Sequence, residues 1–141
     1  MSAPRAPALL RLDHVHVHVR DRAAAERWYR DVLGLVRVKE YEGWATDGGP
    51  LTLTDANGAL HVALFERPPF ENHATLALAV DAGNFLAWKE HLERVLGTEL
   101  EAVDHELSWS LYFSDPDGNP FELTCYEHAA LARRLADARD R

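Results

Sequence analysis

The sequence predicts an α+β domain of two pseudo-symmetric βαβββ modules whose mixed sheets curl around a central cleft. Residues 54–60, Thr-Asp-Ala-Asn-Gly-Ala-Leu, recur without a gap as Ser-Asp-Pro-Asp-Gly-Asn-Pro at 114–120. Before each copy lies a strand-like run and a helical pattern that ends in Val-Leu-Gly. Module one is therefore expected at about 11–66 and module two at about 72–127. Neither half could bury a large core alone, so residues 1–141 are expected to form one domain.

The first module begins with a predicted strand at 12–19, where histidine and valine alternate with the period of a strand that has two unlike faces. Asp21 can cap the helix that follows, and Gly34 ends it. Three further strands are then expected, at 35–41, within 44–54 and at 60–66.

The second module repeats this order with a helix about one turn longer. A strand is expected at 75–80, then a helix with an apolar stripe, then strands near 99–103, 108–113 and 119–126. The remaining tail, 128–141, is rich in alanine, leucine and arginine, which favours a short surface helix.

Strand periodicity assigns side chains to the two faces of each sheet. Val15 and Val17 are apolar and should face the core, so the histidines between them should face the cleft. In the last strand Phe121 and Leu123 take the core face, which leaves Glu122 on the cleft face. The gapless repeat sets Val62 opposite Glu122. Ser110 and Tyr112 also point into the cleft by the same parity.

Bulk composition narrows the class of ligand. The net charge is −8 with 47% hydrophobic residues, and no basic cluster occurs outside the tail. Nucleic acid and anionic membranes are therefore poor partners, since both require positive charge. No stretch is long enough to span a membrane, and Met1-Ser2-Ala3-Pro4 does not begin a signal peptide. These features predict a cytoplasmic protein that binds a small molecule.

Three segments together resemble the vicinal oxygen chelate superfamily. They are Leu12-Asp13-His14-Val15, the helix end Trp28-Tyr29-Arg30-Asp31-Val32-Leu33-Gly34, and the segment 112–123, Tyr-Phe-Ser-Asp-Pro-Asp-Gly-Asn-Pro-Phe-Glu-Leu. That superfamily includes glyoxalase I, fosfomycin-modifying thiol transferases, extradiol dioxygenases and bleomycin-binding proteins. The resemblance covers about 11–127. It implies paired modules around a cleft, usually one divalent metal ion, and often a homodimer.

The resemblance also implies metal ligands. His14 matches the first-strand histidine and Glu122 the last-strand glutamate, whereas Val62 stands where glyoxalase I has a further glutamate. The remaining ligand position matches Thr75, and His73 lies two residues earlier. Two residues of strand span about 6–7 Å, while a metal–nitrogen bond is about 2 Å long. Either a bulge brings His73 into place, or Thr75 leaves the site short of a ligand.

The sequence thus leaves two classes of function. The first is an enzyme dependent on a divalent Fe, Mn, Ni or Zn ion: an isomerase or lyase, a thiol transferase or a dioxygenase. The second is a metal-free resistance protein of the bleomycin-binding type, suggested by Val62 and Thr75. A homodimer is expected because free sheet edges need cover. The site residues assigned are His14, His73 and Glu122 for metal, Glu122 and Tyr112 for catalysis, and His16, Ser110, Tyr112 and Thr75 for substrate.

Overall fold

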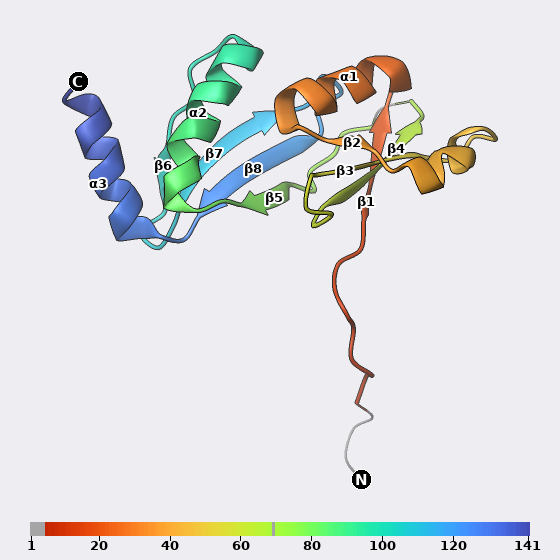
Figure 1. Ribbon diagram of the computed structural model, residues 1–141, viewed down its shortest axis with the longest axis horizontal. Helices are drawn as coiled ribbons and strands as arrows, with labels where there is room; N and C mark the ends of the chain where they lie inside the picture. Colours follow the sequence, from red (N-terminus) through yellow and green to blue (C-terminus); the bar gives the residue numbers. More distant parts are fainter. Residues whose placement is uncertain (1–4, 69) are drawn as a thin grey trace.

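The protein consists of two βαβββ modules followed by a C-terminal helix. The structure is a computed structural model that describes residues 5–68 and 70–141 (Figure 1). Met1–Pro4, on which the absence of a signal peptide was argued, lies outside the described residues. The elements are β1 (Val15–Val19), α1 (Arg22–Leu33), β2 (Val36–Arg37), η1 (Lys39–Ala45), β3 (Leu51–Thr54), β4 (His61–Glu66), β5 (Leu76–Ala79), α2 (Ala82–Leu96), β6 (Val103–Asp104), β7 (Trp109–Ser114), β8 (Pro120–Cys125) and α3 (His128–Arg139).

Each module forms its own four-stranded mixed sheet, in the orders β1-β4-β3-β2 and β5-β8-β7-β6. The first strand of each module pairs in parallel with the last, and the remaining pairs are antiparallel. The predicted α+β class with two repeated modules is confirmed. Among the described helices, none is long and apolar enough to cross a membrane.

The helix boundaries follow the capping residues expected from the sequence. Asp21 accepts a hydrogen bond from the backbone N–H of Ala24 at 3.0 Å, which satisfies one free donor of the first turn. At the other end Gly34 has φ +70°, a conformation that a side chain disfavours, and its N–H donates to the carbonyl of Arg30. Asp81 and Gly97 cap α2 in the same way.

Two of the predicted strands are reduced to two residues each. The strand predicted at 35–41 is reduced to Val36–Arg37, and the chain then turns into the 3₁₀ helix η1. The parallel rings of Tyr41 and Trp44, 4.3 Å apart, stack within this turn. The strand predicted at 99–103 is also short, because Leu100 donates its N–H to Glu93 of α2 rather than to a neighbouring strand.

The two modules of one chain meet on the helix side of the sheets. Helices α1 and α2 contact each other and lie on the same side of the molecule (Figure 1). The hydroxyl of the fully buried Tyr29 in α1 donates to Asp115 of module two at 2.7 Å, and its ring packs edge-on against Phe121. Asn119 donates to the carbonyl of His18 at 3.1 Å.

Tyr29 should make the fold sensitive to alkaline pH. Burial, together with the neighbouring Asp115 carboxylate, raises the pKa of Tyr29 far above its usual value. Above about pH 10 the unfolded chain releases this proton and the native state keeps it, so stability should fall by about 1.4 kcal/mol per pH unit from this group. The free-energy difference between the protein and Tyr29→Phe, measured by urea unfolding, should therefore shrink as the pH rises from 9 to 11. A constant difference would contradict this assignment.

The N-terminal segment 5–14 has no helix or strand and projects away from the sheets (Figure 1). Its side chains Leu9 and Leu10 are 94% and 97% exposed. Burying one leucine side chain contributes about 1.5–3 kcal/mol, so two leucines left in water favour a contact with another surface.

Candidate metal and substrate site

The cleft faces of the two sheets follow the predicted parity, with one correction to the repeat. Leu60 donates its N–H to Asp55, five residues back, whereas Asn119 donates to Asp115, four residues back. The first turn is therefore one residue longer, and the gapless alignment is displaced by one position beyond it. Val62 is a core residue that pairs with Val15.

Ala63 is the true counterpart of Glu122 in module one. Ala63 pairs with His16 across β1 and β4, and Glu122 pairs with Ala77 across β5 and β8. Alanine, like valine, has no side-chain atom that could bind a metal ion. Because alanine is small, it also leaves space beside the histidines of β1.

His14 and His16 lie next to each other at the cleft face of module one. Their Nε2 atoms are 3.0 Å apart, and the two rings stack with centroids separated by 4.9 Å. Nδ1 of His14 lies 2.8 Å from Oδ2 of Asp13. The hydrogen bond from His14 is the main cause that holds the pKa of Asp13 below its usual value. An ionised Asp13 places the His14 proton on Nδ1, so Nε2 of His14 carries the lone pair and accepts the hydrogen bond from His16.

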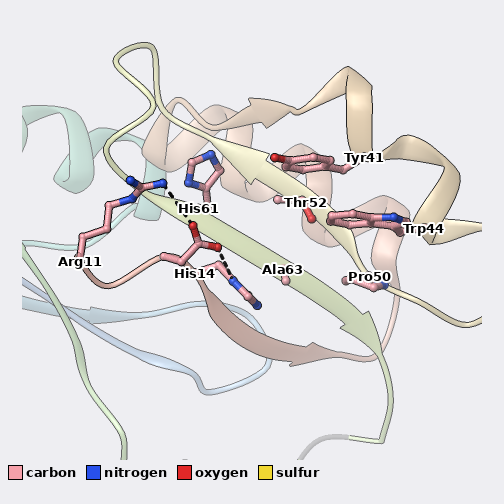
Figure 2. A pocket seen from close by; sticks show the side chains of 9 residues that line it. Arg11, His14, Tyr41, Trp44, Pro50, Thr52, His61 and Ala63 are labelled. Atoms are coloured by element: carbon pink, nitrogen blue, oxygen red, sulfur yellow. Dashed lines mark hydrogen bonds and ion pairs between the residues drawn. The ribbon is translucent and has the colours of Figure 1, made fainter. Parts of the chain in front are cut away.

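A pocket of about 160 Å³ opens beside His14 (Figure 2). One wall carries the aromatic pair Tyr41 and Trp44, and the floor carries the small side chains Thr52 and Ala63. Trp44 is 57% exposed, so much of its ring is free to contact a ligand. A cavity of about 150 Å³ accommodates a benzene ring. The pocket therefore has the size and the lining to hold a small planar molecule.

The polar side of the same pocket is formed by the residues that lead into β1. Arg11 contacts Asp13 at 3.5 Å, and His61 of β4 also lines the pocket. Figure 2 shows the Arg11 and His14 side chains on the same side of the pocket, with the aromatic pair on the other. This division can orient a ligand that has an apolar ring and polar substituents.

Glu122 is the centre of a hydrogen-bonded cluster on the cleft face of module two. Its Oε1 accepts hydrogen bonds from the hydroxyls of Ser110 at 2.6 Å and Tyr112 at 3.0 Å. Nε2 of His105 lies 2.8 Å from the Tyr112 hydroxyl. Partial burial and the bond to Glu122 raise the pKa of Tyr112, so its phenol keeps its proton at neutral pH. These hydrogen bonds place Ser110, Tyr112 and Glu122 on one face of β7 and β8, as the strand parity predicts.

One chain does not assemble the predicted metal trio. Among the described residues, no three His, Cys, Asp or Glu side chains are grouped closely enough to hold an ion. The contacts of His14 come from module one, and those of Glu122 from module two. His73 is 82% exposed, and its ion pair is with Glu71 at 3.3 Å rather than with Glu122. Thr75 lies exposed just before β5.

Three side chains near these clusters were not expected from the sequence. His61 and His105 have no partner at a regular spacing, and only the sheet register brings them near His14 and Tyr112. Trp44 stands in no sequence pattern that separates a ligand contact from packing, which is the common role of tryptophan in a small domain. The presence of Tyr41 three residues earlier is the one sequence signal for a stacked pair, because residues i and i+3 align in a 3₁₀ helix.

Comparison with known proteins places this architecture in a family. The model of the Glyoxalase/Bleomycin resistance protein/Dioxygenase superfamily matches residues 11–123. The chain belongs to this superfamily. Members of the glyoxalase/dioxygenase superfamily include dioxygenases and fosfomycin resistance proteins, so an enzymatic role is consistent with the family.

Individual members of the superfamily differ in what they do. Biphenyl-2,3-diol 1,2-dioxygenase 3 of Rhodococcus globerulus is 33% identical over 123 residues, which are 80% of this chain and 62% of that protein's length. The fosfomycin resistance protein FosX of Listeria monocytogenes, in complex with Mn(II) and sulfate, superposes with a TM-score of 0.66 at 16% identity, over 91% of this chain and 99% of FosX. A glyoxalase/dioxygenase from Nostoc punctiforme gives 0.68 at 20% identity, over 89% and 98%. The two solved structures establish the shared fold.

Proposed function

We propose that this protein is a divalent-metal-dependent enzyme that acts on a small oxygenated molecule. The observation that carries the proposal is the His14 imidazole, which lines the pocket and whose Nδ1 is bound to the Asp13 carboxylate, so that Nε2 is the ring nitrogen with the lone pair. A carboxylate behind a histidine is a common arrangement around metal ligands. Imidazole nitrogen together with the Glu122 carboxylate suits Fe, Mn, Ni or Zn, and the Mn(II) complex of FosX supports such an ion.

The site is completed in this proposal by a second copy of the chain. Within one chain the modules are joined through α1 and α2 and through the hydrogen bond from Tyr29 to Asp115, and His14 and Glu122 belong to separate clusters. In a twofold dimer, module one of each copy can face module two of the other, which gives two equal sites. The exposed Leu9 and Leu10 support a second copy as the covering surface. His14 of one copy and Glu122 of the other would then hold the ion.

The bound ion would polarise a substrate oxygen or an adjacent oxygen pair and stabilise the negative charge that develops there. The pocket residues have separate tasks. Trp44 and Tyr41 contact the flat apolar part of the substrate, while the Arg11 guanidinium can hold a polar substituent. Tyr112 keeps its phenolic proton and can donate it to a substrate oxygen, and Ser110 fixes the rotamer of Glu122.

The aromatic wall favours dioxygenase chemistry over the isomerase, lyase and thiol-transfer alternatives. A planar ring fits the pocket better than an open-chain substrate, since stacked aromatic pairs contribute about 0.5–1.5 kcal/mol beyond buried area. The named substrate of the Rhodococcus relative, an aromatic diol, supports the same class. The proposed substrate is therefore a small oxygenated aromatic compound.

Metal loading tests the proposal. Protein purified without chelator and loaded separately with Fe(II), Mn(II), Ni(II) and Zn(II) should retain about one ion per chain after desalting. His14→Ala should retain almost none, because it removes a ligand. His128→Ala is the control, since His128 begins α3 and pairs with Asp104 away from the pocket. Failure of the unaltered protein to retain any of the four ions would refute the metal-dependent function.

A metal-free binding protein of the bleomycin-binding type is the second candidate. It is favoured by the stacked Tyr41 and Trp44 beside the Asp13 carboxylate, an arrangement that can hold a planar cation through its charge and its ring. The net charge of −8 would attract such a ligand. Tight binding of a planar cationic drug by protein that retains no ion would support this candidate.

A further inference from the structure

We propose that His16 is the second histidine ligand of the ion, paired with His14, which directly precedes β1, in place of the expected His73. This inference rests on the proposed metal-dependent function and specifies which residues of the chain form its nitrogen ligands. The ion would be held by the His-x-His pair at the start of β1 of one copy and by Glu122 of the partner copy.

The distance between the two rings carries the proposal. The Nε2 atoms of His14 and His16 are 3.0 Å apart. Two nitrogens that each lie about 2.1 Å from one ion are about 3.0 Å apart when the angle at the ion is near 90°. The rings are therefore already spaced for neighbouring positions of a six-coordinate ion. Small ring rotations would let both lone pairs converge on an ion in place of the proton that they now share.

The surroundings hold the pair in this arrangement. Asp13 fixes His14 through Nδ1, and the ring of Phe65 packs against the His16 ring with centroids 4.7 Å apart. Ala63 is the cross-strand neighbour of His16 and takes up little space on the cleft face. Ligands restrained by a second layer of contacts lose less freedom on binding an ion.

The proton balance is simple. In the ion-free pair Nδ1 of His14 donates to Asp13, so Nε2 of His14 accepts and Nε2 of His16 donates. Binding an ion at both Nε2 atoms requires His16 to give up this proton and to take one at Nδ1. Both rings stay neutral, and no net proton is released by this tautomer change.

His18 and His73 do not offer this geometry. His18 continues the same face of β1, but its ring packs edge-on against Phe70 with centroids 5.0 Å apart. His73 is turned to solvent and pairs with Glu71. His18 is therefore the matched control for His16, and His73 is the competing assignment.

The test measures nickel affinity in the full-length protein. Isothermal titration with Ni(II) should give a Kd at least about 100-fold weaker for His16→Ala and His16→Gln, because loss of even a supporting contact costs about 10–100-fold. His18→Ala and His73→Ala should change the Kd by less than about threefold. Circular dichroism and urea unfolding of both His16 variants show whether each is folded, and two different replacements guard against a packing defect in one.

A second measurement counts the ligands directly. Pulsed EPR of the Cu(II)-loaded protein should detect two imidazoles, and one in His16→Gln. Two imidazoles in folded His16→Gln, or weak nickel binding by His73→Ala with normal binding by His16→Ala, would overturn the inference while the metal-dependent function stands. No retention of any ion by the unaltered protein would instead remove the proposed function and this inference together.

Discussion

Mixing His14→Ala chains with Glu122→Ala chains is expected to restore metal binding that neither variant shows alone. If each site takes His14 from one copy and Glu122 from the other, a mixed dimer contains one intact site and one doubly defective site. Random exchange makes about half of the dimers mixed, so about one quarter of all sites should be intact. The measurement is bound ion per chain after denaturant-assisted exchange, refolding and desalting.

The control for this experiment uses a double variant in place of the Glu122→Ala chain. Mixing His14→Ala with the double variant His14→Ala/Glu122→Ala should restore nothing, since no pairing then supplies an intact His14. If the site closed within one chain, the first mixture would also bind no ion, although the unaltered protein binds it. The mixture therefore separates the two possible pairings of the modules.

Asp115→Ala is expected to lower the free energy of unfolding by about 3–5 kcal/mol, because it leaves several buried donors without an acceptor. Asp115 is 5% exposed. It accepts hydrogen bonds from the Tyr29 hydroxyl at 2.7 Å, from the side chain of Asn119 at 2.8 Å, and from the backbone N–H groups of Asn119 and Asp117 at 2.9 Å each. Urea unfolding at pH 7, followed by circular dichroism, measures the change.

The repeat supplies a matched control for Asp115. Asp55 occupies the same turn position in module one and accepts from the backbone of Leu60 at 2.8 Å and of Asn57 at 3.3 Å. Because Asp55 stabilises only its own turn, Asp55→Ala should cost about 1 kcal/mol. Equal losses for the two variants would show that the link from Asp115 to Tyr29 adds nothing to the junction between modules.

The repeat and the strand parity were sufficient to predict the fold and the direction of the main side chains. Alternation placed His14, His16 and Glu122 on cleft faces because a strand has a period of two, and no tertiary information is needed for that step. The capping residues Asp21 and Gly34 likewise act within one turn of helix. Such features depend on neighbours in sequence, which a single chain displays directly.

Other parts of the site could not be predicted, for identifiable physical reasons. The extra residue in the first turn is visible only through hydrogen bonds to Asp55, so the alignment of Val62 with Glu122 was wrong by one position. The 3₁₀ helix η1, which contains Tyr41 and Trp44, takes the place of the end of the strand predicted at 35–41. Aromatic residues are common in both kinds of element, so they did not distinguish a helix from a strand here. His73 was assigned from a resemblance, and its distance from the site depends on the path of the segment before β5.

The strand register makes the two modules unequal at matching positions of their sheets. His16 and Ala63 are neighbours in the first sheet, and Ala77 and Glu122 occupy the same places in the second. Each half therefore keeps one kind of donor and has a methyl group where its twin carries the other kind. A site that uses both an imidazole nitrogen and a carboxylate oxygen from these positions therefore requires one half of each kind.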